Sequence, residues 1–170
     1  MDTSITLTIA CWRCPHKEET FPMSTKFLMV IDDSPTICKI LEVALGRQGY
    51  QVRSFLEPLL ALRALFVTGE VPVPDLLFVN LILPRMSGFQ VIQLLRNYPQ
   101  SKHIPIIVIT RRDGLMDRLK ARIVGANEYV TKPFKIQDIV EIVQSQMTKT
   151  NVLTGGRGGD HIPDLHLCLQ

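Results

Sequence analysis

Short apolar runs alternate with helical segments over the middle of the chain, and this alternation predicts the fold. The apolar runs are four or five residues long, the usual length of a buried strand, and they lie at 27–31, 51–55, 76–80, 106–110 and 128–131. In the segments that follow them, apolar residues recur three and four positions apart, as they do on one face of a helix. The pattern therefore predicts five β-α units.

The first helix has the clearest start of the five. Ser34 is placed to cap it, and Pro35 occupies its first position, where the missing N–H of proline does no harm. Gly46 and Gly49 mark its end. The face predicted to be buried carries the apolar residues Ile37, Ile40, Leu41, Ala44 and Leu45.

The other helices are predicted from their flanking residues and apolar stripes. The second, at 59–68, is apolar almost all round, so its limits depend on Pro58 and Gly69. The third is predicted at 88–97 and the fourth at 115–124, where Gly125 stops it. The last carries one apolar stripe of Ile136, Ile139, Val140, Val143 and Met147.

Strands as apolar as these must be covered on both faces, because neither face could be left in water. A parallel sheet with a helix after every strand meets that requirement through right-handed crossover connections. The sequence therefore predicts an α/β protein with a doubly wound, five-stranded parallel sheet.

Composition divides the chain into one domain and two flanking segments. Residues 1–22 show no sustained period and are predicted to be an N-terminal extension, either a disordered arm or non-native sequence before a true start at Met23. The domain is predicted at 23–148. Residues 149–170 are predicted to be a flexible tail, because the run from Gly155 to Gly159 is glycine-rich.

Composition and charge argue against several classes of protein. With 170 residues, of which 46% are hydrophobic and 21% charged, the chain can bury one core. Its net charge of +3 is small and its basic residues are interspersed with acidic ones, which argues against nucleic acid as a partner. No apolar stretch reaches the roughly 18 residues that span a bilayer, so we expect a cytoplasmic protein without a membrane partner.

The four cysteines are too few and too unevenly spaced for a disulfide framework, and reduced thiols are expected. Cys11 and Cys14 form a Cys-x-x-Cys segment that could be a redox pair or half of a zinc site. It lacks the strand and helix of a thioredoxin motif, and zinc would need ligands such as His161 or Cys168 from the other terminus. Cys38 falls in the apolar pattern of the first helix and is expected in the core.

Polar residues stand where four of the predicted strands end. Asp32 and Asp33 follow the first strand, Asn80 ends the third, Thr110 ends the fourth, and Lys132 follows the fifth. Ligands of open parallel sheets bind outside the carboxyl ends of the strands, so these side chains predict one polar site. Taken alone, the acid pair could also serve to cap the next helix, and Thr110 could merely end its strand.

Several spaced segments strengthen this prediction: Val-Ile-Asp-Asp-Ser at 30–34, Leu-Pro-Arg-Met-Ser-Gly at 83–88, Thr110, and Tyr-Val-Thr-Lys-Pro-Phe at 129–134. In this order they resemble the receiver domains of two-component response regulators, the CheY-like family, over about residues 26–147. The resemblance implies a flavodoxin-like sheet in the order 2-1-3-4-5 with five helices. It also implies a cis peptide bond between Lys132 and Pro133.

The resemblance places an unexpected residue at the centre of the site. In that family an aspartate four residues before the proline of the Leu-Pro motif accepts a phosphoryl group, and counting back from Pro84 gives Asn80. A neutral amide is poor both at attacking phosphorus and at binding Mg²⁺. Asn80 could be a structural amide, a deamidation site, or an engineered replacement of an aspartate.

The remaining site residues are carried over from the same resemblance. Asp32 and Asp33 are the acid pair that would hold Mg²⁺, Thr110 and Tyr129 are the switch residues, and Lys132 is the ion-pair partner. With an amide at position 80 the local charge is about −1 instead of −2, so Mg²⁺ binding should be weakened. Lys132 could then pair with Asp32 or Asp33 without a metal.

Basic residues extend the predicted site toward a partner surface. Arg111 follows the switch threonine, where the family usually has a small residue, and it could cap the mouth of the site or point to solvent. The fourth helix, by which receivers usually meet partners, is surrounded by Arg112, Arg118, Lys120 and Arg122. These could face an acidic protein or simply be solvated.

The sequence thus predicts a stand-alone signalling module of a two-component phosphorelay, and not an enzyme. We expect an atypical receiver that acts by contact with a protein, either a histidine kinase or a downstream signalling protein, and a homodimer is left open. One alternative is an ordinary receiver whose natural residue 80 is aspartate, or that is phosphorylated on Asp32 or Asp33. Another is a flavodoxin-like protein that binds a small ligand at the polar edge.

Overall fold

The apolar runs of the sequence form the strands of one sheet. The computed structural model describes residues 25–154, in which five parallel strands lie in the order β2-β1-β3-β4-β5. Their bounds are Phe27–Ile31 for β1, Gln51–Phe55 for β2, Leu76–Val79 for β3, Ile106–Thr110 for β4 and Glu128–Thr131 for β5. The predicted fold class and strand order are confirmed, and β3 ends one residue earlier than predicted.

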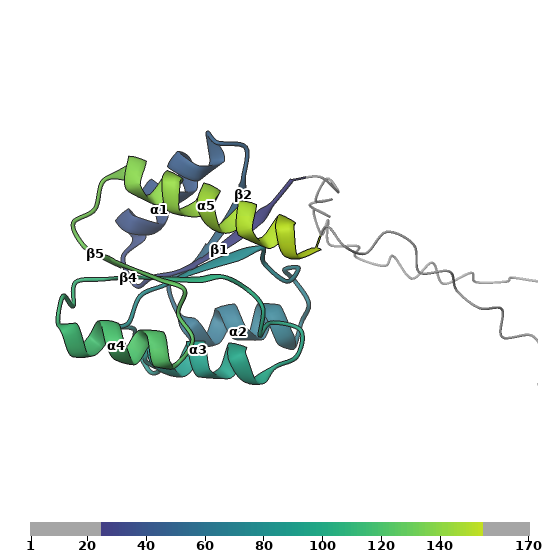
Figure 1. Cartoon of the computed structure of the whole chain (residues 1–170). Helices are drawn as coiled ribbons and strands as arrows, with labels where there is room; N and C mark the ends of the chain where they lie inside the picture. Colours follow the sequence, from purple (N-terminus) through teal and green to yellow (C-terminus); the bar gives the residue numbers. More distant parts are fainter. Residues whose placement is uncertain (1–24, 155–170) are drawn as a thin grey trace, which may run out of the picture.

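Five helices cover the two faces of this sheet. Helices α1 and α5 lie on one face, and α2, α3 and α4 lie on the other (Figure 1). Their bounds are Pro35–Gly46 for α1, Pro58–Phe66 for α2, Gly88–Asn97 for α3, Leu115–Ile123 for α4 and Ile136–Thr154 for α5. Over residues 25–154, none of the helices has the length and hydrophobicity needed to cross a membrane.

Two hydrophobic cores, one on each face, hold the helices against the sheet. Alternate residues of β1 enter them: Met29 and Ile31 belong to the core of α2, α3 and α4, whereas Leu28 and Val30 belong to that of α1 and α5. These four side chains are at most 1% exposed, and burying each contributes about 1.5–3 kcal/mol. Because helices cover both faces of the sheet, the ends of the strands are where polar side chains can form a site.

The buried face of α1 differs in part from the prediction. Cys38, Leu41 and Leu45 are buried, whereas Ile40, which was predicted to lie on the buried face, is 40% exposed. A helix that lies on a sheet buries only a narrow stripe, and the stripe here is centred nearer to Cys38. The expectation of a core position for Cys38 is confirmed, and burial raises the pKa of its thiol.

Helix α5 is longer than the sequence pattern predicted. It continues to Thr154, whereas the domain was predicted to end at residue 148. No glycine or proline occurs between Lys135 and Gly155, so nothing stops the helix earlier. The predicted N-terminal extension with Cys11 and Cys14, and residues 155–170 of the tail predicted at 149–170, lie outside the described residues.

A half-buried arginine ties α3 to the loops before β4 and β5. The guanidinium of Arg96 donates to the main-chain oxygens of Lys102 at 3.0 Å, Ile104 at 2.9 Å and Gly125 at 2.7 and 3.1 Å, and to Oδ1 of Asn127 at 3.1 Å. All of these acceptors are neutral, and burial lowers the pKa of the guanidinium. Arg96 therefore fixes two loops by geometry and not by charge pairing.

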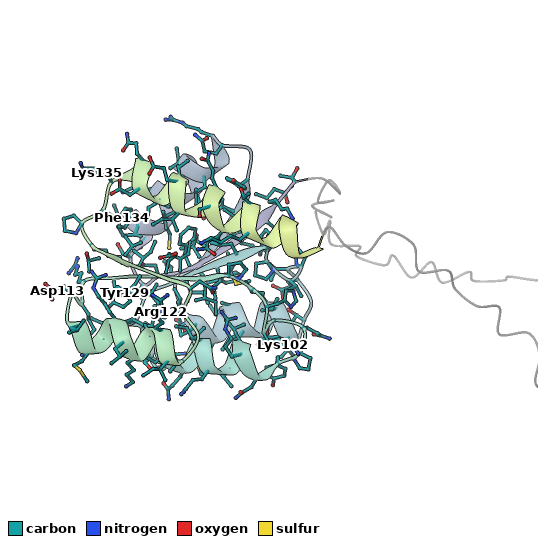
Figure 2. All side chains as sticks on the ribbon, viewed as in Figure 1. Lys102, Asp113, Arg122, Tyr129, Phe134 and Lys135 are labelled. Carbon is teal, nitrogen blue, oxygen red and sulfur yellow. The ribbon has the colours of Figure 1, made fainter. Side chains whose placement is uncertain are left out.

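Replacing Arg96 with lysine is expected to lower the free energy of unfolding by about 2 kcal/mol, because one ammonium cannot serve acceptors on both loops. Urea-induced unfolding would measure the change. Arg122→Lys, at an exposed arginine of α4 (Figure 2), is the control and should change the free energy by less than about 0.5 kcal/mol. Equal effects of the two substitutions would contradict the role of Arg96.

Candidate functional site

The strands bring their polar ends to one edge of the sheet. Ile31, the last residue of β1, lies beside Val79, the last residue of β3, so Asp32 and Asn80 leave the sheet together. Thr110 ends β4 at the same edge. Asp32, Asn80 and Thr110 are 2%, 6% and 0% exposed, and polar groups buried this deeply need hydrogen-bond partners.

Asp32 finds its main partner in Lys132. The Lys132 ammonium lies 2.5 Å from Oδ2 of Asp32, and the main-chain N–H of Ser34 donates to Oδ1 at 3.0 Å. Burial raises the pKa of Asp32, although both of these contacts act in the opposite direction. The contribution of Asp32 to stability is therefore fully present below its ordinary pKa of 3.8 and is lost as the pH rises through the raised value.

Asn80 bonds to the second acid of the pair. Its Nδ2 donates to Oδ1 of Asp33 and to the main-chain oxygen of Ile82, both at 2.9 Å, and its Oδ1 accepts from the Ile82 N–H at 3.3 Å. Two acceptors around Nδ2 fix the orientation of the amide, since the flipped form would face oxygen with oxygen. Both Nδ2 hydrogens are thereby used within the protein.

A close contact behind the site sets the main chain of residue 80. A Cβ atom added to Gly88 would lie 2.1 Å from the main-chain oxygen of Asn80, so only glycine fits at the start of α3. The Gly88 N–H donates to the Leu81 oxygen at 3.0 Å. Between these residues Arg85 has a positive φ of 65° and pairs with Glu57 at 3.2 Å. Nothing in the spacing of the sequence predicted that pair.

A cavity of about 770 Å³ opens in front of these groups. It is lined by Asp33, Ser34, Thr36, Ile37, Asn80, Ile82, Arg111, Lys132 and Pro133. Arg111 is among these lining residues and is also exposed, so its role as a cap of the site stays a prediction. The peptide bond between Lys132 and Pro133 is cis, as expected from the resemblance.

Thr110 and Tyr129 lie beside the cavity but do not line it. The Thr110 hydroxyl accepts from the Arg112 N–H at 3.4 Å, and the Tyr129 hydroxyl donates to the Arg112 main-chain oxygen at 2.8 Å. The guanidinium of Arg118 lies 4.9 Å from the centre of the Tyr129 ring. In Figure 2 Tyr129 and Asp113 lie at the edge where β4 and β5 end, opposite the edge that carries Lys102.

The basic residues around α4 are mostly engaged within the protein. Arg112 pairs with Asp117 at 3.0 Å, Lys120 lies 4.6 Å from the centre of the Phe89 ring, and Arg118 covers Tyr129. The exposed feature of this helix is apolar instead. Leu115, Met116, Leu119 and Ile123, termed the α4 stripe below, are 51–78% exposed. The sequence prediction for this helix considered only its charged residues, although the run of apolar residues was also visible in the sequence.

A divalent cation fits the acid pair poorly. Asp32 already accepts from Lys132 and Ser34, and Asn80 turns its N–H group toward Asp33, where a cation would need an oxygen. Within residues 25–154 no group of three or more acids, histidines or cysteines could hold a metal ion. Hydrogen bonds thus engage both carboxylate oxygens of Asp32 and Oδ1 of Asp33.

Comparison with known proteins gives one consistent family. Residues 28–144 match the family model described as the response regulator receiver domain. The chain is 34% identical over 120 residues to Protein PilG of Pseudomonas aeruginosa, which covers 71% of this chain and 86% of PilG. Among solved structures, the chemotaxis response regulator CheY4 of Vibrio cholerae shares the fold, with a TM-score of 0.65 and 23% identity over 72% of this chain and 99% of that one.

Longer relatives match over part of their length only. The DNA-binding dual master transcriptional regulator RpaA of Synechocystis sp. is 30% identical over 124 residues, which are 73% of this chain but 50% of RpaA. The chain thus spans about half the length of that relative.

Replacing Lys132 with methionine is expected to lower the free energy of unfolding by about 3 kcal/mol at neutral pH, because Asp32 would be a buried charge without an opposite charge beside it. The loss should shrink as the pH is lowered to about 4, since a protonated Asp32 carries no charge. Urea unfolding at several pH values would measure this. Lys135→Met, at an exposed lysine nearby (Figure 2), should show no such dependence. A pH-independent loss in Lys132→Met would contradict the pairing.

Proposed function

Because this chain belongs to the response regulator receiver family, we propose that it is a two-component signalling module whose phosphoacceptor position is held by Asn80 and stays unphosphorylated. The family match over residues 28–144 supports the receiver role. The position of Asn80, at the end of β3 and four residues before Pro84, supports the rest. Receiver domains are signalling modules and not enzymes of the usual kind, and we infer the same for this chain.

The single observation that carries the proposal is the bonding of the Asn80 amide. An acceptor must present an anionic oxygen to phosphorus, and an amide has none. The Nδ2 hydrogens of Asn80 are used by Asp33 and Ile82, and its Oδ1 accepts from the Ile82 N–H. This amide is therefore a structural member of the site, which supports the first of the interpretations considered for it.

The acid pair supports a site that works without a metal. Receiver domains generally bind Mg²⁺ at this acidic pocket. In this chain Lys132 neutralises Asp32, and Nδ2 of Asn80 donates to Oδ1 of Asp33, where an aspartate at position 80 would offer an anionic oxygen for a cation. Without a phosphoryl group or a metal to favour a second state, the conformation is set by the sequence or by another ligand.

Output through protein contact follows from the surface of α4. The α4 stripe places four large apolar side chains on one exposed helix, a feature that marks interaction sites more often than a scattered hydrophobic surface does. Neighbouring charges of both signs favour a protein over nucleic acid. We therefore infer that the partner is a histidine kinase or a downstream signalling protein that packs on α4.

Intact-mass measurement after incubation with acetyl phosphate and Mg²⁺ tests the proposal. The unaltered protein should gain no phosphate, because residue 80 lacks the attacking oxygen. Asn80→Asp should gain one, since Asp32, Asp33, Thr110 and Lys132 remain in place. A phosphate adduct on the unaltered protein would sink the proposal.

The control for that experiment is Asn97→Asp, which creates an exposed aspartate at the end of α3, away from the site. It should gain no phosphate, so an adduct specific to position 80 can be told from non-specific labelling. If Asn80→Asp also stays unmodified, the remaining residues are not a competent receiver site, and the family role would need another explanation.

The α4 stripe should contribute little to stability if it is kept for a partner. Ile123→Gln, at a side chain that is 76% exposed, is expected to change the free energy of unfolding by less than about 0.5 kcal/mol. Ala121→Gln, on the same helix but 1% exposed, should lower it by about 2 kcal/mol or more because the larger side chain overfills the core. Urea unfolding would compare the two. A large loss in Ile123→Gln would assign the stripe to the fold.

A further inference from the structure

The polar groups of the 770 Å³ cavity divide into those that are already bonded and those that are not. Asn80 is bonded to Asp33 and Ile82, and Lys132 to Asp32. Ser34 accepts from the N–H of Ile37 at the start of α1. Three polar side chains of the lining thus already have a hydrogen-bond partner within the protein.

Two oppositely charged side chains of the lining, those of Arg111 and Asp33, do not pair with each other. Within the described part of the chain, the Arg111 guanidinium has no ion pair or hydrogen bond, and only Oδ1 of Asp33 is used. No ion pair joins Arg111 to Asp33, so their charged atoms lie more than 4.0 Å apart. A guanidinium and a carboxylate oxygen are therefore both open to the same cavity.

The rest of the lining is apolar or carries a hydroxyl. Ile37, Ile82 and Pro133 contribute hydrocarbon surface, and Thr36 contributes a hydroxyl for which the described residues provide no partner. A volume of about 770 Å³ lies within the range of roughly 300–1,000 Å³ that is usual for small-molecule sites. Apolar walls with a few placed polar groups are the composition of such sites.

We propose that this cavity binds a small zwitterion of the amino-acid type, with its carboxylate on Arg111, its ammonium on Asp33, and an apolar body against Ile37, Ile82 and Pro133. The inference rests on the proposed function, since it is the amide of Asn80 that leaves an Asp33 oxygen free of a metal. It names the kind of ligand that would set the state of the module in the absence of phosphorylation.

A ligand with a single charge would match this lining less well. An anion on Arg111 would be repelled by Asp33, and a cation on Asp33 would be repelled by Arg111. A molecule that carries both charges can pair with both groups, and its apolar body contributes burial. Because Arg111 and Asp33 do not pair with each other, a zwitterion matches this lining best.

Binding there would reach the partner surface through one short loop. Arg111 precedes Arg112, whose main chain bonds to both Thr110 and Tyr129 and whose side chain pairs with Asp117 of α4. A ligand that fixes Arg111 would therefore favour one arrangement of the segment before α4. A differential affinity of this kind is the thermodynamic requirement for a regulatory ligand.

Isothermal titration of the full chain with L-leucine, L-methionine and L-phenylalanine tests the proposal. At least one of them is expected to bind. The same amino acid with its carboxylate blocked as the amide, or with its ammonium blocked by acetylation, should bind roughly tenfold more weakly, the loss expected for one charge-assisted hydrogen bond. No heat with any of the three amino acids would overturn the proposal.

Variants locate the binding. Arg111→Gln and Asp33→Asn should each weaken it about tenfold, and Arg111→Gln should abolish the preference for a free carboxylate over the amide. Arg47→Gln, at an exposed arginine at the far end of α1, is the control and should bind as the unaltered protein does. Binding that is indifferent to both Arg111→Gln and Asp33→Asn would place the ligand elsewhere and overturn the proposal.

The titration and the phosphorylation test can refute their two proposals independently. A phosphate adduct on the unaltered protein refutes the role of Asn80 whatever the titration shows. An absence of binding, with the intact mass unchanged, refutes the ligand and leaves the unphosphorylated module in place. Addition of Mg²⁺ gives a further readout, because a cation that took Asp33 would compete with the ammonium, and unchanged affinity is expected if the acid pair holds no metal.

Discussion

The ion pair between Asp32 and Lys132 is the interaction on which the polar edge of this protein depends. It joins the ends of β1 and β5, which are separated in the sheet by β3 and β4. The two side chains are 2% and 10% exposed, so neither charge would be tolerated there alone. Lys132, which follows β5, neutralises Asp32, and Asn80, which follows β3, bonds to Asp33, so these two contacts link the ends of β1, β3 and β5.

Much of this arrangement could be predicted from sequence because it follows from local rules. Short apolar runs followed by helical periods specify a covered parallel sheet, and in such a sheet the residues after each strand meet at one edge. The pairing within the edge could not be predicted, since Lys132 had two acids within reach. The choice of Asp32 follows from three-dimensional contacts, in which Asp33 is turned toward Asn80.

The surface of α4 shows where reasoning from charge alone falls short. Its basic residues lie in the sequence as a patch, yet Arg112, Arg118 and Lys120 each contact a side chain of the same protein. Such contacts depend on where loops and rings lie, which spacing does not encode. The exposure of Leu119 and Ile123 could not be predicted either, because apolar residues four apart usually mark a buried stripe, whereas the buried residue of this helix is Ala121. The position of the Arg111 side chain could not be predicted for the same reason as those of Arg112 and Arg118, because it depends on where the loop lies.

The main chain at residue 80 is positioned independently of its side chain. Its N–H donates to the Ile31 oxygen at 2.9 Å, and its carbonyl packs on Gly88, so neither contact involves the amide. Asparagine and aspartate differ by one base in their codons and have nearly the same shape. If the proposed function holds, a lineage with this backbone would gain or lose covalent signalling in one mutational step while keeping the fold, and the chemistry of the module is then a more changeable trait than its architecture.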